Sequence, residues 1–374
     1  MSESQTKSES GIEQPLVLAG AGHAHLVLMR SWRDRGYQPP PGTVLVAPES
    51  HAWYSGMMPG LIAGRFQLTQ CAIDLQPWCQ ALGITLRLAS VVALNSQQRC
   101  LQLDDGTELA YQKLSINTGS MTAGPPHNDG SVPLIPAKPF SRFIDHWQHW
   151  QQQPPRRLLV AGGGAAAFEL VVALRRAFPT VALRLVCASE LLASHPKSMR
   201  LLARAILQQQ HIHCDEHTRL TGIAQGELFA GTTGLGGADA LILATGASAL
   251  PWYRQSGLAC DDNGFLRVNA CLQSVTDPEV LVSGDAAAAP GSQHSGVFSV
   301  RHGPVLAHNL RALLEHTTLL AYQPQAHTLA LLATGDGGAL MSYGRYGAGN
   351  RLLRRVLGRW KDHLDLGFMR RHSL

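Results

Sequence analysis

Residues 15–32 read PLVLAGAGHAHLVLMRSW, and this stretch indicates the fold of the chain. Leu16–Ala19 is a short apolar run typical of a buried strand, a glycine-rich turn follows, and a helix is expected to open near His23. Residues 156–177, RRLLVAGGGAAAFELVVALRRA, repeat this plan with a strand predicted at Leu158–Ala161. The sequence therefore contains an internal duplication.

Each copy is followed by a second apolar strand, at Thr43–Ala47 and at Ala182–Cys187. A strand, a glycine-rich turn, a helix and a further strand make the βαβ unit of a dinucleotide-binding fold. One such loop is a weak signal, because strand-to-helix glycines also serve packing, but two in matching context are a strong one.

A second pair of landmarks supports the duplication. Thr118-Gly119 and Thr245-Gly246 each end an apolar strand, in LSINTGS and LILATGAS. Short alternating stretches with turn signals precede each landmark, which predicts a β-meander after each βαβ unit. The fold class expected is α/β, with two Rossmann-like dinucleotide-binding domains, each carrying a β-meander.

The glycines of each loop have specific physical roles. The first permits a backbone conformation closed to other residues, and the next lets backbone N–H groups approach a pyrophosphate at the positive end of the helix. Gly20 and Gly22 are placed to do this in the first unit, and Gly162 and Gly164 in the second. Both units are therefore predicted to bind a dinucleotide.

The third glycine of the pattern is replaced in both units. Ala167 in the second unit is an ordinary replacement that still allows close packing of helix on strand. His25 in the first unit is a departure. Either the first helix lies further from the sheet, or the imidazole turns aside.

Composition narrows the classes of function. The 374 residues carry a formal net charge of +5 from 31 basic and 26 acidic side chains, too mild an excess to indicate nucleic acid. The 17 histidines show no zinc-ligand spacing, and the seven cysteines include no CxxC pair. No apolar signal core or run of membrane-spanning length is found, so a soluble, cytoplasmic protein with reduced thiols is expected.

The order of the motifs resembles one branch of the two-dinucleotide-binding-domain flavoproteins. That branch is the pyridine nucleotide-disulfide oxidoreductase-like family found fused to selenophosphate synthetase (selenide, water dikinase), a distant relative of type II NADH dehydrogenases. The motifs that carry the resemblance are GAGHAH, HAWYSGMMPGLIAG, NTGS, PAKP, AGGGAAAFEL, LILATG, VLVSGDAAA, VRHGPVLAHNL and RWKDHLDLGFMRR.

The resemblance implies FAD in the first unit and NAD(P)H in the second. The residues it assigns to FAD are Gly20, Gly22, His23, Tyr54, Ser55, Gly56, Met57, Pro59, Thr118, Gly119, Gly284 and Asp285. Those it assigns to the nicotinamide nucleotide are Gly162, Gly164, Ala167, Glu169 and Gly246. Asp285, after an apolar strand at Val280–Ser283, would accept hydrogen bonds from the ribityl chain or cap a small helix.

Two positions depart from the superfamily pattern. The acidic residue expected at the end of each second strand is replaced by Ala47 in the first unit and by Cys187 in the second. Glu49 lies two residues beyond Ala47. Either Glu49 substitutes and reaches the adenosine ribose, or this contact is absent. No arginine directly follows Cys187, so the choice between NAD and NADP stays open.

The cysteines bear on the mechanism. The resemblance implies a closely spaced redox pair beside the flavin for a disulfide reductase, and cysteines late in the chain for a sulfide:quinone oxidoreductase. This sequence has neither, since no cysteine follows Cys271. Hydride transfer from nicotinamide to flavin is the expected chemistry, with electrons passed on to a quinone or small molecule.

Two cationic residues are assigned catalytic roles. Lys138, in PAKP, would stabilise anionic reduced flavin, or lie solvated on the surface. Arg301 falls where type II NADH dehydrogenases carry a quinone-site element, but GVFSVRHG departs from that element. Arg301 would shield the flavin or bind an anionic substrate, or cap the preceding turn.

The last 22 residues, LRRVLGRWKDHLDLGFMRRHSL, interleave apolar with basic side chains. An amphipathic helix on an anionic membrane is one interpretation, and packing on the FAD domain or on the second chain of a homodimer is the favoured one.

The expected organisation and the alternative functions complete these predictions. A flavin enzyme acting directly on a small molecule, linked to selenium, and a flavoprotein redox sensor with a decayed nicotinamide site are the alternatives. The expected segments are a disordered 1–14, an FAD-binding domain in two parts, 15–125 and 256–325, an NAD(P)-binding-like domain, 126–255, and a C-terminal interface or membrane-surface segment, 326–374.

Overall fold

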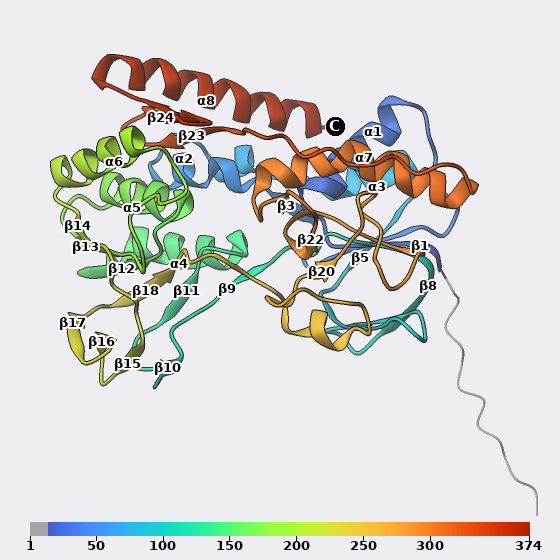
Figure 1. Ribbon diagram of the computed structural model, residues 1–374, viewed down its shortest axis with the longest axis horizontal. Helices are drawn as coiled ribbons and strands as arrows, with labels where there is room; N and C mark the ends of the chain where they lie inside the picture. The colour runs from blue at the N-terminus through green and yellow to red at the C-terminus, as the bar shows by residue number, and fades with distance from the viewer. Residues whose placement is uncertain (1–13) are drawn as a thin grey trace, which may run out of the picture.

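The computed structural model describes residues 14–374. Figure 1 shows two sheets with their helices side by side, and a long helix that lies across both along one edge of the molecule. The first described strand begins at Gln14, so the rest of the segment expected to be disordered lies outside the described residues.

The first sheet has a parallel centre that is extended by an antiparallel meander. Its parallel strands are β5 (Thr85–Leu88), β2 (Val44–Ala47), β1 (Gln14–Ala19), β8 (Glu108–Ile116) and β21 (Val280–Val282). The meander adds β7 (Cys100–Leu103) and β6 (Val91–Asn95). Leu16–Ala19 reads as one apolar run because its residues are buried on both faces.

Helices α1 (His23–Asp34) and α7 (Gly296–Glu315) lie side by side over this sheet, next to α3 (Leu75–Leu82) (Figure 1). Their close approach depends on Gly303, where a Cβ would lie 2.5 Å from the Cβ of Val27. The glycine therefore allows the two helices to pack closely.

The second sheet repeats the plan of the first. Its parallel strands are β11 (Leu134–Pro136), β18 (Ala240–Leu243), β12 (Arg157–Ala161), β13 (Ala182–Val186) and β14 (His213–Asp215). Its helices are α4 (Phe140–Gln152), α5 (Ala165–Ala177) and α6 (Lys197–Gln209). A second meander consists of β15 (Gly222–Ala224), β16 (Glu227–Ala230) and β17 (Thr233–Gly237), and β10 (His127–Asn128) pairs with β15 in parallel. The predicted duplication and both meanders are confirmed.

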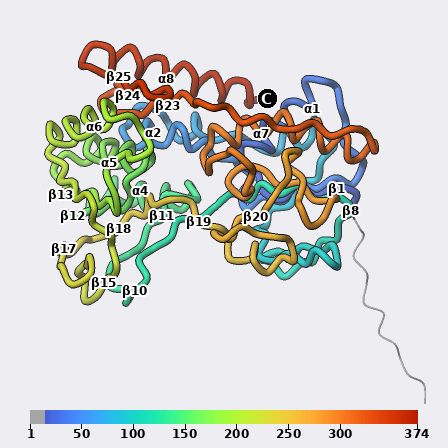
Figure 2. The backbone as a smooth tube through the Cα atoms, in the orientation of Figure 1, coloured from blue at the N-terminus to red at the C-terminus, as the bar shows by residue number. Residues whose placement is uncertain are grey.

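The chain crosses between the two sheets through two short segments, and these segments pair with each other as β-strands. Strand β9 (Met121–Thr122) follows the first Thr-Gly landmark, and β19 (Ala247–Ser248) follows the second; the two run antiparallel. In Figure 2 the chain passes between the two halves at β19, below the C-terminal segment that also runs from one half to the other.

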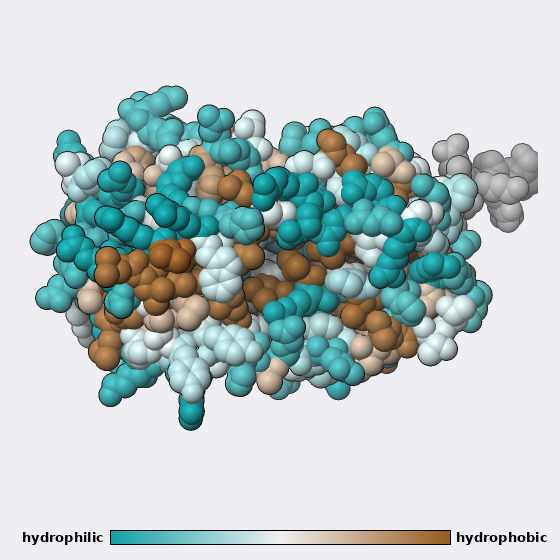
Figure 3. Space-filling model, turned by 90° about the horizontal axis from the view of Figure 1, so that it is seen from above, coloured by the Kyte–Doolittle hydropathy of each residue, from teal (hydrophilic) through white to brown (hydrophobic). Residues whose placement is uncertain are grey.

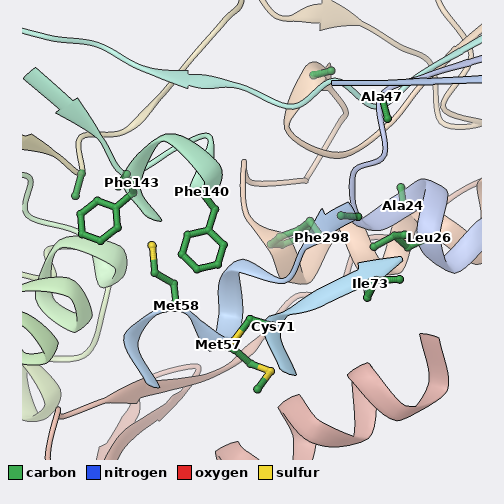
Figure 4. Close-up of a cluster of buried hydrophobic side chains, with 14 of the residues drawn as sticks. Ala24, Leu26, Ala47, Met57, Met58, Cys71, Ile73, Phe140, Phe143 and Phe298 are labelled. Atoms are coloured by element: carbon green, nitrogen blue, oxygen red, sulfur yellow. The ribbon is translucent and has the colours of Figure 1, made fainter. Parts of the chain in front are cut away.

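Short elements complete the space between the sheets. They are β3 (His51–Trp53), β4 (Ala72–Asp74), α2 (Met58–Ile62), β20 (Leu266–Arg267) and β22 (Ala287–Ala288). Figure 4 shows Met58 of α2 lying beside Phe140 and Phe143 of α4, all three buried. Apolar packing thus joins the segment that follows β3 to the second half of the molecule.

The C-terminal segment forms a three-stranded sheet and the longest helix. The elements are β23 (Leu329–Ala333), β24 (Ala339–Tyr343), β25 (Tyr346–Ala348) and α8 (Arg351–His372). Helix α8 begins after Asn350, whose Oδ1 accepts a hydrogen bond from the Leu353 N–H at 3.0 Å.

One face of α8 packs on the rest of the chain, as the favoured interpretation predicted. Leu357, Phe368 and Met369 are buried, and the Trp78 Nε1–H donates to the His372 carbonyl at 2.7 Å. No helix within residues 14–374 combines the length and apolar content needed to cross a bilayer.

Candidate active site

The first glycine loop follows β1 and is shaped by Asn117 at the end of β8. Gly20 has φ +89°, and a Cβ there would lie 2.6 Å from the Asn117 carbonyl oxygen. A Cβ on Gly22 would collide with the Asn117 side chain. Both positions therefore require glycine, for backbone conformation at Gly20 and for space at Gly22.

The helix that follows this loop begins without a capping side chain of its own. Gly22 is the N-cap of α1, the first turn has no acidic residue, and the His25 N–H donates to the Asn117 Oδ1 at 3.3 Å. The N–H groups ahead of His25 are left for water or an anion. The loop fits a pyrophosphate.

His25, the departure in the first unit, is buried and turned towards β8. Its Nδ1 is hydrogen-bonded to the Gly20 carbonyl, and its Nε2 lies 2.8 Å from the Ser115 Oγ. Because a carbonyl only accepts, Nδ1–H is the donor and Nε2 accepts from the serine hydroxyl. Burial lowers the pKa of His25 to about 4, so the ring is neutral and braces the loop from below.

The second glycine loop has the same plan. Gly162 has φ +147°, and a Cβ there would collide with the Ala244 carbonyl, just as one on Gly20 would meet Asn117. Ala167 is buried beneath it. Gly164 is the N-cap of α5, again with no capping side chain and no acid in the first turn.

Gly164 differs from Gly22 in one respect that matters for experiment. A Cβ on Gly164 would meet no atom within 4 Å, and its φ of −89° is open to all residues. The same open space surrounds Gly246. The fold itself therefore does not require a glycine at either position. Open space in front of the α5 N-terminus leaves room for a pyrophosphate, so the second loop also fits one.

Asp285 lies between the two halves of the molecule. Its Oδ2 accepts from the Lys138 Nζ at 2.7 Å and from the Ser120 Oγ at 3.1 Å. The preceding Gly284 has φ +62°, and a Cβ there would lie 2.5 Å from the Asn117 Nδ2. Asn117 therefore packs against both the first glycine loop and the Gly-Asp turn.

The first Thr-Gly landmark is held by Tyr253. The Thr118 Oγ1 lies 2.8 Å from the Tyr253 hydroxyl, which donates to the Gly119 carbonyl at 2.7 Å. Tyr253 is fully buried, and desolvation raises its pKa, so the phenol stays protonated. The landmark is thus fixed in place before the chain crosses to the second half.

Tyr54 lies on the segment after β3 and meets the C-terminal helix. Its ring stacks on Phe368 of α8 with centroids 4.5 Å apart and lies 5.4 Å from the His23 ring. Its hydroxyl donates to the Asp365 Oδ1 at 3.1 Å. Burial lowers the pKa of His23 to about 4, so this edge of the site carries no positive imidazole.

Helix α8 brings an ion pair to the same place. The Lys361 Nζ donates to the Asp365 Oδ2 and to the Gly56 carbonyl, each at 2.9 Å. Burial raises the pKa of Asp365, against the opposing pull of Lys361. Burial by itself would lower the pKa of Lys361. The negative charges of Glu169 and Asp365 outweigh burial, so the pKa of Lys361 is raised overall.

Glu169 of α5 is the third charged member of this cluster. Its Oε1 accepts from the Ala333 N–H at 2.7 Å. Burial raises the pKa of Glu169 to about 7, opposed by Lys361. The C-terminal segment thus holds the carboxyl that follows the second glycine loop.

This titration predicts a pH-dependent stability. Above its ordinary pKa of 4.5 the unfolded chain loses the Glu169 proton, whereas the folded protein keeps it up to about pH 7. The free energy of unfolding therefore falls as pH rises between these values, by about 3 kcal/mol from this group. Glu169→Gln, which cannot ionise, is expected to remove that fall in urea unfolding measured across the range. Glu227→Gln, on an exposed glutamate, is the control. Parallel pH profiles for wild type and Glu169→Gln would refute the prediction.

The structure also locates the remaining predicted residues. Ser55–Met57 form one 3-10 turn, and Met57 and Pro59 are buried. Glu49 is half-buried and accepts from the Trp53 Nε1–H at 2.6 Å. Arg301 lies in α7, and its Nη1 is buried without a hydrogen-bond partner among the described residues.

Sequence reasoning missed four residues of this arrangement. Asn117 is the first residue of NTGS. Its position directly before the Thr-Gly landmark is the signal from which a role beside the first glycine loop could have been predicted. Tyr253, Lys361 and Asp365 give no local signal of the site, because the contacts that bring them to it are with Thr118, Gly56 and Tyr54, more than 130 residues away in sequence.

Comparisons with known proteins agree with this geometry. Residues 15–311 match the family model for pyridine nucleotide-disulphide oxidoreductase. The sulfide:quinone oxidoreductase of Aquifex aeolicus superposes with a TM-score of 0.74 at 13% identity, covering 96% of this chain and 92% of that one. A ferredoxin reductase from Rhodopseudomonas palustris gives 0.71 at 18% identity, covering 88% of this chain and 82% of that one.

A water-forming NADH oxidase from Lactobacillus brevis, in a structure bound to NADH, gives a TM-score of 0.70 at 14% identity and covers 89% of this chain and 75% of that one. At these identities the solved structures show the fold alone. The family match spans both glycine loops, both meanders and the Gly-Asp turn. The chain therefore belongs to the pyridine nucleotide-disulphide oxidoreductase family and is an FAD-dependent oxidoreductase with FAD and a nicotinamide nucleotide as its cofactors.

Proposed function

We propose that the protein is an NAD(P)H oxidoreductase that holds FAD on the first glycine loop and the nicotinamide nucleotide on the second. The single observation that carries this assignment is the pair of acid-free helix N-termini with a glycine as N-cap, each behind a glycine loop, at Gly22 and Gly164. When bound, the flavin supplies the hydride-accepting chemistry and passes electrons on.

The residues of the chain would hold and orient these groups. Asp285 would accept hydrogen bonds from ribityl hydroxyls, and Lys138, which contacts it, would place positive charge beside the flavin. Tyr54, fixed by Asp365 and Phe368, would flank the isoalloxazine. Arg301 would offer its unpartnered Nη1 to the acceptor, which favours a quinone or a small molecule with an anionic oxygen.

The motif order also supports placing the chain in the branch of the family that is found fused to selenophosphate synthetase.

Two alternative functions differ from the proposed one in how the flavin is reduced. One is a flavin enzyme that directly oxidises a small selenium-linked molecule, and the other is a redox sensor with a decayed nicotinamide site. Anaerobic mixing of the purified protein with NADH or NADPH distinguishes them. Rapid bleaching of the flavin by either donor, then reoxidation by a quinone or dye, is the proposed behaviour, and no bleaching by either donor would refute it.

The outer face of α8 supports an acceptor that resides in a membrane. Leu352, Val356, Trp360 and Leu364 recur every fourth residue and are 84%, 60%, 41% and 44% exposed. Exposed arginines at 351, 355 and 359 flank this apolar stripe. Figure 3, which looks down on α8, shows an apolar patch beside hydrophilic side chains where the first half of the helix lies. An apolar stripe beside cations is typical of a helix that lies on an anionic bilayer.

A double substitution tests this membrane contact. Leu352→Ser with Val356→Ser is expected to weaken sedimentation with phosphatidylglycerol vesicles by about tenfold, because it removes the two most exposed apolar side chains of the stripe. Leu201→Ser, on a leucine of α6 that is 53% exposed, is the matched control. Equal binding by the double variant and the control would exclude the stripe as the contact.

A further inference from the structure

Two thiols that are distant in sequence lie together beside the second glycine loop. Cys187 directly follows β13, and Cys214 is the middle residue of β14. The register pairs Leu185 with Cys214, so Cys187, two residues further on, shares a face of the sheet with Cys214. Their sulfur atoms are 4.0 Å apart, and both thiols are free.

This pair is connected to the nucleotide loop itself. The Cys187 Sγ lies 3.3 Å from the Gly162 carbonyl oxygen, and a Cβ on Gly163 would lie 3.6 Å from the same sulfur. The segment after Cys187 returns to the loop, since the Leu192 N–H donates to the Gly163 carbonyl at 2.7 Å. A movement of Cys187 would therefore disturb its contact with Gly162 and, through Leu192, the position of Gly163 in the loop.

The two thiols have different exposure and acidity. Cys187 is fully buried, and its hydrogen bond with Cys214, followed by desolvation, raises its pKa. Cys214 is half-buried, and the bond from Cys187 lowers its pKa because that S–H can donate to the Cys214 thiolate. Of the two thiols, Cys214 is therefore the more exposed and the more acidic, and an oxidant would meet it first.

We propose that Cys187 and Cys214 form a reversible dithiol-disulfide site, closed by a hydroperoxide, that controls nucleotide entry to the second glycine loop. The Cys214 thiolate attacks the peroxide, so that an S–O bond forms, the O–O bond breaks and the leaving oxygen departs after protonation, as water from hydrogen peroxide or as an alcohol from an organic hydroperoxide. The Cys187 sulfur then attacks the Cys214 sulfur, the S–S bond forms, the S–O bond breaks and water leaves. The dithiol loses two electrons, the peroxide gains them, and a dithiol reductant reverses the change.

Closing the bond must bring the two sulfurs together. A disulfide has its sulfurs about 2 Å apart, so this pair must approach by roughly 2 Å. Strand β14 is held by α6, since the Arg204 Nε donates to Glu216 at 2.8 Å, and it is tied to β13 by the Arg184 Nε, which donates to Asp215 at 2.6 Å. Cys187 would give up its contact with the Gly162 carbonyl, and the loop would shift with it.

The first arm of the test asks whether the bond forms. The full-length flavoprotein is treated with hydrogen peroxide, the remaining thiols are alkylated, and the peptides are mapped by mass spectrometry. The expected product is a Cys187–Cys214 linked peptide that dithiothreitol releases. Absence of this peptide from wild-type protein after peroxide treatment would overturn the proposal, whatever the behaviour of the variants.

The second arm, which rests on the proposed function, measures NADH and NADPH binding. Oxidation of wild type is expected to weaken binding by about tenfold, and dithiothreitol should restore it. Cys214→Ser should keep its affinity under peroxide, whereas Cys271→Ser, a half-buried thiol elsewhere, should lose affinity as wild type does. A linked peptide with unchanged affinity would overturn the control of nucleotide entry. Failure of the reduced protein to bind either nucleotide would instead refute the proposed function and leave the mapped disulfide standing.

Discussion

Gly164→Val is expected to leave the protein folded and flavin-bound but to slow flavin reduction by NADH and NADPH by about 100-fold or more. The position has ordinary backbone torsions, and an added Cβ would meet no protein atom within 4 Å. The branched side chain would fill the space in front of the α5 N-terminus that we assign to the pyrophosphate. Displacing the nucleotide by an ångström or two would misalign its nicotinamide with the flavin.

The measurement is anaerobic stopped-flow reduction at several donor concentrations, with flavin content and unfolding midpoint recorded in parallel. Ala177→Val, at the other end of α5, is the control for added bulk on the same helix. Wild-type reduction rates in Gly164→Val would remove the second loop from the nucleotide site. A loss of flavin as well would mean that the two loops are not independent.

Gly20→Ala is expected to release FAD and to lower the free energy of unfolding by about 3 kcal/mol or more. Two costs combine at this position. The backbone has φ +89°, and the new Cβ would lie 2.6 Å from the Asn117 carbonyl oxygen. Since the obstructing atoms are backbone at the end of β8, relief requires the loop to move away from the sheet.

Gly36→Ala separates these two costs. Gly36 has φ +64°, but a Cβ there would meet no atom within 4 Å. It therefore carries only the conformational penalty, about 1–2 kcal/mol, and should retain its flavin. Urea unfolding and the flavin-to-protein absorbance ratio report both effects. Equal destabilisation of the two variants, or full flavin in Gly20→Ala, would contradict the clash with Asn117.

The features that the sequence predicted well are local. Strand, glycine turn and helix lie within 20 residues at 15–32, so periodicity and glycine placement suffice to predict both units. The order of the Thr-Gly landmarks and the meanders repeats, which is why the tandem architecture could be predicted without any long-range contact. The C-terminal helix followed from its apolar spacing, and the structure divides its two faces between packing and exposure.

The features that escaped prediction depend on contacts across the fold. For His25 the sequence leaves two outcomes open, and only the fold shows that the imidazole turns towards β8, where Ser115 and the Gly20 carbonyl satisfy its ring. Lys361 and Asp365 read as part of an amphipathic helix, because nothing near them in sequence marks Tyr54 and Gly56 as their partners. Cys187 and Cys214 are 27 residues apart, and only the pairing of β13 with β14 brings them together.

The measurement that tests the central claim most directly is identification of the flavin released from the purified protein by denaturation. The account requires a dinucleotide, because the first loop offers its acid-free helix end to a pyrophosphate and Asp285 lies beyond it. Chromatography should therefore show FAD in a near-equal ratio to protein, and its loss from Gly20→Ala. Release of FMN alone, or a colourless protein that takes up no added FAD, would contradict the account.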